Sequence, residues 1–259
     1  MLAFDDTGSG VPTVLIHGWA ASRRIWHHTV PQLPGRRVIA IDVPGFGASP
    51  AAGDGFDLEA VAETIWKGLP ADGPVALVGH SLGAAIALTA AAQQPDRAAA
   101  LVLCAPAGLR PIPSLASGPA GVLGALAIDL RRIALPYASG SPLGRRLLLG
   151  ASTAMGDAVS EEDVITMVTA SEHATRTAAA LEAVTRADLR PLLTQAPAAL
   201  GVLCGEHDRV IPPSTIDVVL AARPDAVADR VPGTGHVPMM ERPTVFAAML
   251  RQVLDRLSA

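Results

Sequence analysis

Aromatic residues and lysine are scarce in this sequence of 259 residues. Phenylalanine, tryptophan and tyrosine together make up 3% of it, and one lysine, Lys67, accompanies 19 arginines. The formal net charge of −4 argues against a basic surface dense enough to bind nucleic acid. Because half of the residues are nevertheless apolar and 48 are alanine, small side chains carry much of the hydrophobicity, which suits closely packed helices.

Cysteines and targeting signals are scarce as well. Cys104 and Cys204 are too few and too far apart for a disulfide framework or a pair of metal ligands, so buried, reduced thiols are predicted. The first ten residues contain acids and no apolar run, unlike a signal peptide, so we expect a cytoplasmic protein. Residues 73–95 and 111–128 lack charge but contain Gly, Pro, Ser or His, which favours a strand–turn–helix unit and a Pro-rich loop over membrane spans.

The sequence does contain a regular alternation of two patterns. Short, almost continuously apolar runs, which are typical of strands buried on both faces of a parallel sheet, occur at residues 13–17, 38–42, 75–79, 100–104, 199–204 and, more weakly, 228–231. Helical patterns lie between them, at residues 23–33, 58–68, 82–94, 213–222 and 244–257. The alternation predicts an α/β protein with a mostly parallel, doubly wound sheet flanked by helices.

This alternation breaks once, between residues 104 and 199. Residues 109–188 show no convincing strand and are interpreted as helical hairpins inserted into a core of residues 1–108 and 189–259. The first half of the insert carries five arginines, at positions 110, 131, 132, 145 and 146, and acids follow at positions 157, 161, 162 and 163. Solvated helix faces explain such a charge distribution without a partner.

The strongest motif is the pentapeptide GHSLG at residues 79–83. It has the form G-x-S-x-G, and it stands directly between a predicted strand and a predicted helix, as its mechanism requires. The glycines allow a sharp turn that holds the serine in a strained, exposed position beside the start of the helix. Ser81 is therefore the candidate nucleophile.

A serine hydroxyl needs a neighbouring base, and the base needs an acid that orients it. Asp208 and His236 each follow a predicted strand, and active-site groups collect beyond the carboxyl ends of strands in such sheets. The chain order Ser81, Asp208, His236 is the order expected for this arrangement. Glu206 and His207 are rivals, but both lie closer to the preceding strand and are less suited to the two roles.

The remaining histidines of interest receive structural interpretations. His27 and His28 are adjacent in a predicted helix with no other ligand at metal spacing, so a solvated or partly packed pair is expected rather than a metal site. The side chain of His80 is expected to point away from the site, on the opposite side of the turn. No metal and no organic cofactor is predicted.

An oxyanion hole needs two donors aimed at the developing negative charge. One donor should be the backbone N–H of Leu82, which follows the candidate nucleophile. The other should come from the loop at residues 17–22, where Trp19 is the best candidate. The alternative for Trp19 is a core residue, and its backbone could donate even then.

Five segments in order resemble the α/β-hydrolase superfamily: HGW at 17–19, DVPGFGAS at 42–49, GHSLG at 79–83, GEHD at 205–208 and GTGHVPMMERP at 233–243. The resemblance covers nearly the whole chain except the insert. It implies Ser81 as nucleophile, His236 as general base and then acid, and Asp208 as the orienting acid.

The resemblance also implies that the N–H groups of Trp19 and Leu82 form the oxyanion hole and that the insert is a helical cap. Asp42 resembles a structural aspartate of the family. Members usually open with an antiparallel hairpin, and only about twelve residues precede Thr13, so the first strand or two are expected to be short or missing.

The nucleophile narrows the expected chemistry. Family members that displace groups at carbon resemble one another in using aspartate, whereas serine implies acyl transfer. The favoured reaction is hydrolysis of a carboxylic ester through an acyl-enzyme on Ser81. Thioesters, lactones and carbon–carbon bonds remain alternatives, as do a cofactor-free perhydrolase or haloperoxidase and a non-enzymatic ligand receptor on the same fold.

Small capped carboxylesterases, including the pimeloyl-carrier-protein methyl ester esterase type, are the members that the HGW and GHSLG segments resemble most. That resemblance implies an acidic acyl carrier protein as a partner for the arginines of the insert. Phe46 and Val237 are candidate pocket residues. Tyr137 is the only aromatic residue of the insert, so a roof of aliphatic side chains should suit aliphatic acyl groups.

Overall fold

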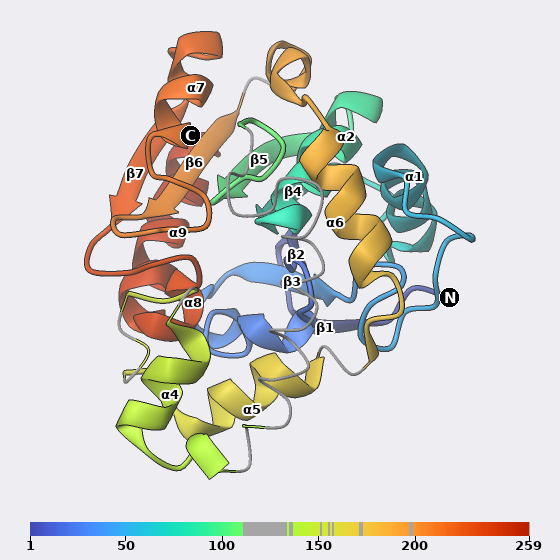
Figure 1. Ribbon diagram of the computed structural model, residues 1–259. Helices are drawn as coiled ribbons and strands as arrows, with labels where there is room; N and C mark the ends of the chain where they lie inside the picture. Colours follow the sequence, from blue (N-terminus) through green and yellow to red (C-terminus); the bar gives the residue numbers. More distant parts are fainter. Residues whose placement is uncertain are drawn as a thin grey trace.

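The computed structural model describes residues 1–110, 134, 137–150, 152–154, 156, 158–170, 173–196 and 199–258. Within these residues a seven-stranded sheet has the order β1-β3-β2-β4-β5-β6-β7 (Figure 1). Strands β2 to β7 run parallel, and β1 runs antiparallel to β3. Their bounds are β1 (Phe4–Gly8), β2 (Val11–Ile16), β3 (Arg36–Ile41), β4 (Val75–His80), β5 (Ala98–Cys104), β6 (Leu200–Gly205) and β7 (Val227–Val231).

Helices cover both faces of the sheet, because successive side chains of a strand point to opposite faces. In β2, Val14 and Ile16 belong to one hydrophobic core and Leu15 belongs to the other. The first core includes residues of α1 (Leu58–Gly68), α2 (Leu82–Gln93) and α7 (Thr215–Ala222). The second includes residues of the 3-10 helix η1 (Arg23–Trp26), α8 (Pro238–Glu241) and α9 (Pro243–Leu257). The predicted doubly wound sheet is therefore confirmed.

Helix α2 explains part of the alanine content. Residues 82–91 are all buried, and the helix contacts β4, β5 and α1. Small side chains let a helix approach its neighbours closely on every side. Larger side chains would hold the neighbouring elements further away. The same helix begins directly after Ser81, so its packing sets the position of that residue.

One sequence prediction about the first forty residues is corrected, and another is confirmed. Residues 23–33 form η1 and a second 3-10 helix, η2 (Val30–Gln32), instead of one α-helix. Pro31 lacks the backbone N–H that a continuous α-helix would bond to the His27 carbonyl, which accounts for the interruption. The opening hairpin is missing, as expected: the one strand before β2 is β1, with five residues, and it pairs with β3 and not with β2.

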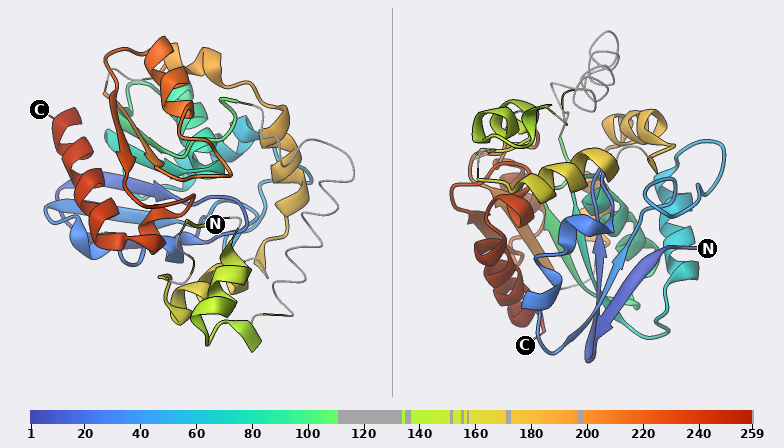
Figure 2. Two further views of the ribbon diagram at one scale, coloured as in Figure 1. Left: turned by 60° about the vertical axis from the view of Figure 1, so that its left-hand side comes forward. Right: turned by 90° about the horizontal axis from the view of Figure 1, so that it is seen from below.

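The described part of the insert is helical. Helices α4 (Pro142–Leu149), α5 (Glu161–Ala170) and α6 (Thr177–Arg186) are followed by the 3-10 helix η5 (Arg190–Thr194). In Figure 2 (right) α4, α5 and α6 lie on the same side of the sheet. Residues 111–133, with the uncharged stretch 111–128 and with Arg131 and Arg132, lie outside the described residues.

Hydrogen bonds place the insert over the carboxyl ends of the parallel strands. Trp19, in the loop after β2, donates its indole N–H to the Thr177 carbonyl at 2.7 Å. In the loop after β7, the backbone N–H of His236 donates to the Ser152 carbonyl at 2.9 Å. In the part of the chain that is described, no helix is long and apolar enough to cross a lipid bilayer.

Candidate active site

The turn between β4 and α2 is strained at one residue. Ser81 has φ 54° and ψ −115°, a backbone conformation that costs of order 1–3 kcal/mol for a residue with a side chain. Gly79 and Gly83 make the turn possible by close packing: a Cβ on Gly79 would lie 2.2 Å from the Gly83 carbonyl oxygen, and one on Gly83 would lie 2.3 Å from that of Ile16. The sequence predicted the strain but not the burial, since Ser81 is only 9% exposed.

Three side chains predicted from the sequence meet beside this turn. Nε2 of His236 lies 3.0 Å from Oγ of Ser81, and Nδ1 of the same ring lies 2.7 Å from Oδ2 of Asp208. An ionised carboxylate only accepts hydrogen bonds, so the proton between His236 and Asp208 belongs to Nδ1. The lone pair of Nε2 is thereby directed at the hydroxyl of Ser81, which is the arrangement a general base requires.

The loop after β6 holds the carboxylate of Asp208 in one orientation. Oδ1 accepts the backbone N–H groups of Val210 at 2.8 Å and Ile211 at 2.9 Å, which leaves Oδ2 for His236. The rival residues point elsewhere: Glu206 accepts the N–H of Gly233, and its side chain is half-exposed. The local turn therefore selects Asp208 over Glu206 for contact with His236.

A buried acid that the sequence analysis missed holds the loop that carries His236. Glu241, in α8, accepts the N–H groups of Gly235 at 2.9 Å and Val237 at 3.3 Å, on either side of His236. It also accepts the N–H of Ala154, which belongs to the insert, at 2.8 Å. A carboxylate that satisfies several backbone donors fixes a loop strongly. One feature of the sequence could have indicated a role for this residue: it is an acid in the otherwise apolar segment PMME.

The prediction for His80 is wrong, because its ring lies beside the candidate base. Nε2 of His80 lies 2.7 Å from the His236 carbonyl oxygen, and the two ring centroids are 4.9 Å apart. Burial and the neighbouring His236 ring lower the pKa of His80 to about 3. A neutral ring that donates to this carbonyl supports the loop of His236 without adding charge to the site.

His17 shapes the loop of the candidate oxyanion hole. The Val43 N–H donates to its Nε2 at 2.9 Å, so the ring proton lies on Nδ1, 2.8 Å from the Gly18 carbonyl. Burial lowers the pKa of His17 to about 4, which keeps the ring neutral in the physiological range. The ring thereby joins the loops that follow β2 and β3.

The two predicted oxyanion donors flank the serine. Leu82 is the first residue of α2, where a backbone N–H has no partner within the helix. The chain just before Trp19 passes against the serine, since a Cβ on Gly18 would lie 3.1 Å from Cβ of Ser81. Among the described residues, the N–H groups of Trp19 and Leu82 are not hydrogen-bonded to the backbone.

The two predicted pocket residues are buried in the cores. Phe46 is 0% exposed and packs edge-on against His17 and Phe56. Gly45 and Gly47, both with positive φ, turn the loop after β3 so that the ring between them points inward. Val237 belongs to the core on the opposite face of the sheet. Neither residue lines either of two hollows, of about 630 and 110 Å³, in the described part, so their place in the substrate pocket stays a prediction.

Several other predictions can be compared with the structure. Asp42 is buried and accepts hydrogen bonds from the backbone N–H groups of Arg23 and Ala48, so it organises the loop after β3. Cys104 and Cys204 are free and buried, as expected. Burial raises the pKa of the Cys204 thiol to about 12, which makes it unreactive at neutral pH.

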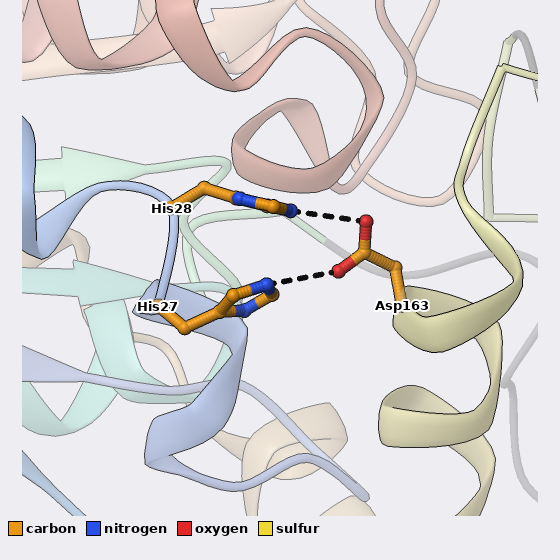
Figure 3. Close-up of side chains that lie close together, drawn as sticks. All are labelled: His27, His28 and Asp163. Atoms are coloured by element: carbon orange, nitrogen blue, oxygen red, sulfur yellow. Dashed lines mark hydrogen bonds and ion pairs between the residues drawn. The ribbon is translucent and has the colours of Figure 1, made fainter.

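His27 and His28 are a partly exposed pair, as predicted, and a third potential ligand lies beside them. Asp163, at the start of α5 in the insert, faces both rings, with contacts of 3.2 Å to Nε2 of His27 and 3.1 Å to Nε2 of His28 (Figure 3). This contact could not be predicted from the sequence, because 135 residues separate His28 from Asp163.

Comparisons with known proteins agree with this architecture. The alpha/beta hydrolase family matches residues 13–249. The pimeloyl-[acyl-carrier protein] methyl ester esterase of Methylococcus capsulatus is 31% identical to the chain and aligns with 98% of each sequence. A thermophilic esterase from Thermogutta terrifontis is 27% identical, with a TM-score of 0.76 over 100% of this chain and 94% of that one.

A bromoperoxidase from Bacillus anthracis, at 22% identity, shares the fold with a TM-score of 0.80 over 98% of this chain and 95% of that one. The family match covers strands β2 to β7, and the mostly parallel sheet and the strand–turn–helix unit at Ser81 agree with the predicted fold. The chain therefore belongs to the alpha/beta hydrolase family and is a hydrolase.

Proposed function

We propose that the chain is a serine carboxylesterase that cleaves esters of small, aliphatic acyl groups. The observation that carries this proposal is the hydrogen-bonded sequence from Ser81 through His236 to Asp208, with contacts of 3.0 and 2.7 Å. Two of the proteins to which the chain is similar are named esterases, which supports an ester over a thioester, a lactone or a carbon–carbon bond.

The proposed reaction begins when Oγ of Ser81 attacks the ester carbonyl carbon while Nε2 of His236 takes the hydroxyl proton. The carbonyl oxygen becomes an oxyanion that the N–H groups of Trp19 and Leu82 stabilise, each by about 3 kcal/mol. The carbon–oxygen bond to the alcohol then breaks, and His236 gives the proton to the departing oxygen. An acyl group remains on Ser81.

Water completes the cycle. His236 takes a proton from a water molecule that attacks the acyl carbon, and it returns the proton to Oγ of Ser81 as the carboxylic acid leaves. Asp208 stays ionised throughout and stabilises the imidazolium that forms twice in each cycle. The bonds and protons of the whole cycle are accounted for by the substrate, water and these side chains.

The insert at residues 109–188 is proposed to be the cap that covers this site, on the core of residues 1–108 and 189–259. Thr177 of α6 contacts the loop after β2, and Ser152, which follows α4, contacts the loop after β7 that carries His236. Tyr137 is 89% exposed, so its ring does not face inward. The apolar side chains that the described part of the cap can offer to a substrate are then aliphatic. Such a lining favours aliphatic over aromatic acyl groups.

A series of p-nitrophenyl esters tests the proposed reaction and the acyl preference. We expect steady multiple turnover, with kcat/KM for the acetate or butyrate ester at least tenfold above that for the benzoate ester. Release of a single equivalent of p-nitrophenol, with the acyl group left on the protein, would support a ligand receptor instead. A faster benzoate ester would contradict the aliphatic pocket, and peroxide-dependent bromination measures the haloperoxidase alternative.

We also propose an acidic acyl carrier protein as the carrier of the substrate. On α4 the side chains of Leu143 and Leu147 are 68% and 76% exposed, and Arg146 is exposed on the same helix. Arg145 is held by the Ser139 carbonyl at 3.0 Å and is less available. Exposed apolar groups beside a cation suit an acidic helix of a partner, and a relative is named for an acyl-carrier-protein ester.

Reversing the charge of Arg146 tests this partner. Arg146→Glu is expected to raise KM for a carrier-bound pimeloyl methyl ester about tenfold, because a favourable charge contact becomes repulsive. Hydrolysis of p-nitrophenyl acetate should not change. Arg251→Glu, an exposed arginine on α9 of the core, is the matched control and should affect neither substrate. Equal KM values for wild type and Arg146→Glu would contradict docking on α4.

A further inference from the structure

His27, His28 and Asp163 form a compact cluster at the contact between the core and the insert. The two histidines follow η1, and Asp163 lies in the first turn of α5 (Figure 3). One ligand atom from each residue can be chosen so that all three lie within 4.8 Å of one another. The two rings lie close together, with centroids 3.8 Å apart.

One ring nitrogen of His27 lies close to the carboxylate of Asp163. Nδ1 of His27 lies 2.7 Å from the Arg24 carbonyl oxygen, so a neutral ring carries its proton there. Nε2 then has no proton, yet it faces Oδ1 of Asp163 at 3.2 Å. Two acceptors at this distance repel each other, and either a second proton on the ring or a cation bound by both groups relieves that repulsion.

The carboxylate of Asp163 supplies a second, independent observation. The residue is 2% exposed, and within the described structure its Oδ1 is a buried oxygen with no hydrogen-bond donor. A buried, ionised oxygen without a donor is costly. Its other oxygen, Oδ2, accepts the Ser160 hydroxyl at 2.7 Å and faces Nε2 of His28 at 3.1 Å.

We propose that these three side chains bind one divalent transition-metal ion of the zinc type. Nitrogen ligands bind zinc at about 2.0–2.1 Å and carboxylate oxygens at about 2.0–2.2 Å, so ligands of a tetrahedral ion lie about 3.3 Å apart. The observed gaps, 3.2 Å from Nε2 of His27 to Oδ1 of Asp163 and 3.1 Å from Nε2 of His28 to Oδ2, are close to that separation for a carboxylate that binds through both oxygens. Two imidazoles and one carboxylate favour zinc, nickel or copper over magnesium or calcium, which prefer oxygen ligands.

Neighbouring groups already orient the ligands, as outer partners do in protein metal sites. The Arg24 carbonyl holds Nδ1 of His27, which leaves Nε2 of the same ring free to bind a metal ion beside Asp163. Ser160 caps α5 by accepting the Asp163 N–H at 3.0 Å while its hydroxyl holds Oδ2. Both histidines are partly exposed, which leaves room for water as a fourth ligand.

The ion would join α5 of the insert to the core beside η1. Because the ligands come from both segments, an ion bound there stabilises the folded arrangement by mass action and raises the unfolding temperature as its concentration rises. The proposed ester hydrolysis needs no metal, so the metal site and the esterase function are independent proposals.

Calorimetric titration of the full, untagged chain after EDTA treatment and dialysis tests the proposal. We expect one Zn²⁺ per chain and no detectable binding of Mg²⁺, together with a higher unfolding temperature in excess zinc. Asp163→Asn and His28→Gln should each weaken zinc binding by about 100-fold or more, since each removes a ligand. His173→Gln, an exposed histidine of the insert outside the cluster, should bind zinc as the wild type does.

Circular dichroism and p-nitrophenyl acetate hydrolysis establish that each variant is folded. Asp163→Asn also alters the cap of α5, so His28→Gln, on the half-exposed side of the cluster, supplies the test if the first variant does not fold. The proposal is overturned if the wild type binds no zinc, or if folded His28→Gln binds zinc with the affinity of the wild type.

Discussion

Replacing Ser81 with alanine is expected to lower kcat for p-nitrophenyl acetate by about 10⁶-fold, the size of effect seen when the nucleophile of a catalytic triad is removed. The substitution deletes the oxygen that lies 3.0 Å from Nε2 of His236 and leaves every other group in place. Steady-state kinetics measures the loss, and circular dichroism should show an unchanged fold. Activity within tenfold of the wild type would rule out a nucleophilic role for Ser81.

Ser81→Gly is the companion variant that separates strain from chemistry. Glycine adopts φ 54° without the steric cost that serine and alanine share at this position. The glycine variant should therefore be as inactive as Ser81→Ala, while its free energy of unfolding should exceed that of Ser81→Ala. If strain rather than the hydroxyl supported activity, the two variants would differ in kcat.

Asp208→Asn is expected to lower kcat by about 10⁴-fold without moving the site, the loss that follows when the base of a triad is held in the wrong tautomer. The reason lies in the two backbone N–H groups, of Val210 and Ile211, that donate to Oδ1 of Asp208. An asparagine keeps its carbonyl oxygen at that position, so its NH₂ group faces Nδ1 of His236. The ring must then carry its proton on Nε2 and cannot accept one from Ser81.

Glu206→Gln is the matched control, because Glu206 lies two residues away and also accepts a backbone N–H, that of Gly233. It does not contact His236 among the described hydrogen bonds, so kcat should stay within a factor of about two of the wild type. A large loss in Glu206→Gln together with a small loss in Asp208→Asn would exchange the roles of the two acids. Wild-type activity in both variants would show that neither acid is needed to orient His236.

The sequence predicted best those features that depend on neighbouring residues or on strand order. The turn at Ser81 is local, because its strand, glycines and helix are consecutive, and α1 begins and ends at the predicted residues. Asp208 and His236 could be placed because each directly follows a strand of a parallel sheet, and the carboxyl ends of such strands meet at one edge.

Features that depend on contacts between distant segments could not be predicted. Glu241 holds the N–H of Ala154, 87 residues away, and Asp163 meets His28 across 135 residues. No periodic pattern in the sequence indicates either of these two contacts. The direction of the Phe46 side chain could not be predicted either, because a loop with two glycines can turn it inward or outward, and in the structure it packs against His17.

Stoichiometric labelling with a p-nitrophenyl phosphonate ester tests the central claim most directly, because a triad serine displaces p-nitrophenolate from phosphorus and keeps the phosphonyl group. We predict one p-nitrophenolate released per chain, complete loss of ester hydrolysis, a mass increase of one phosphonyl group, and a modified peptide that contains Ser81. The reaction should be absent in Ser81→Ala and much slower in Asp208→Asn. A label on another residue, or ester hydrolysis that survives full labelling of Ser81, would contradict the account.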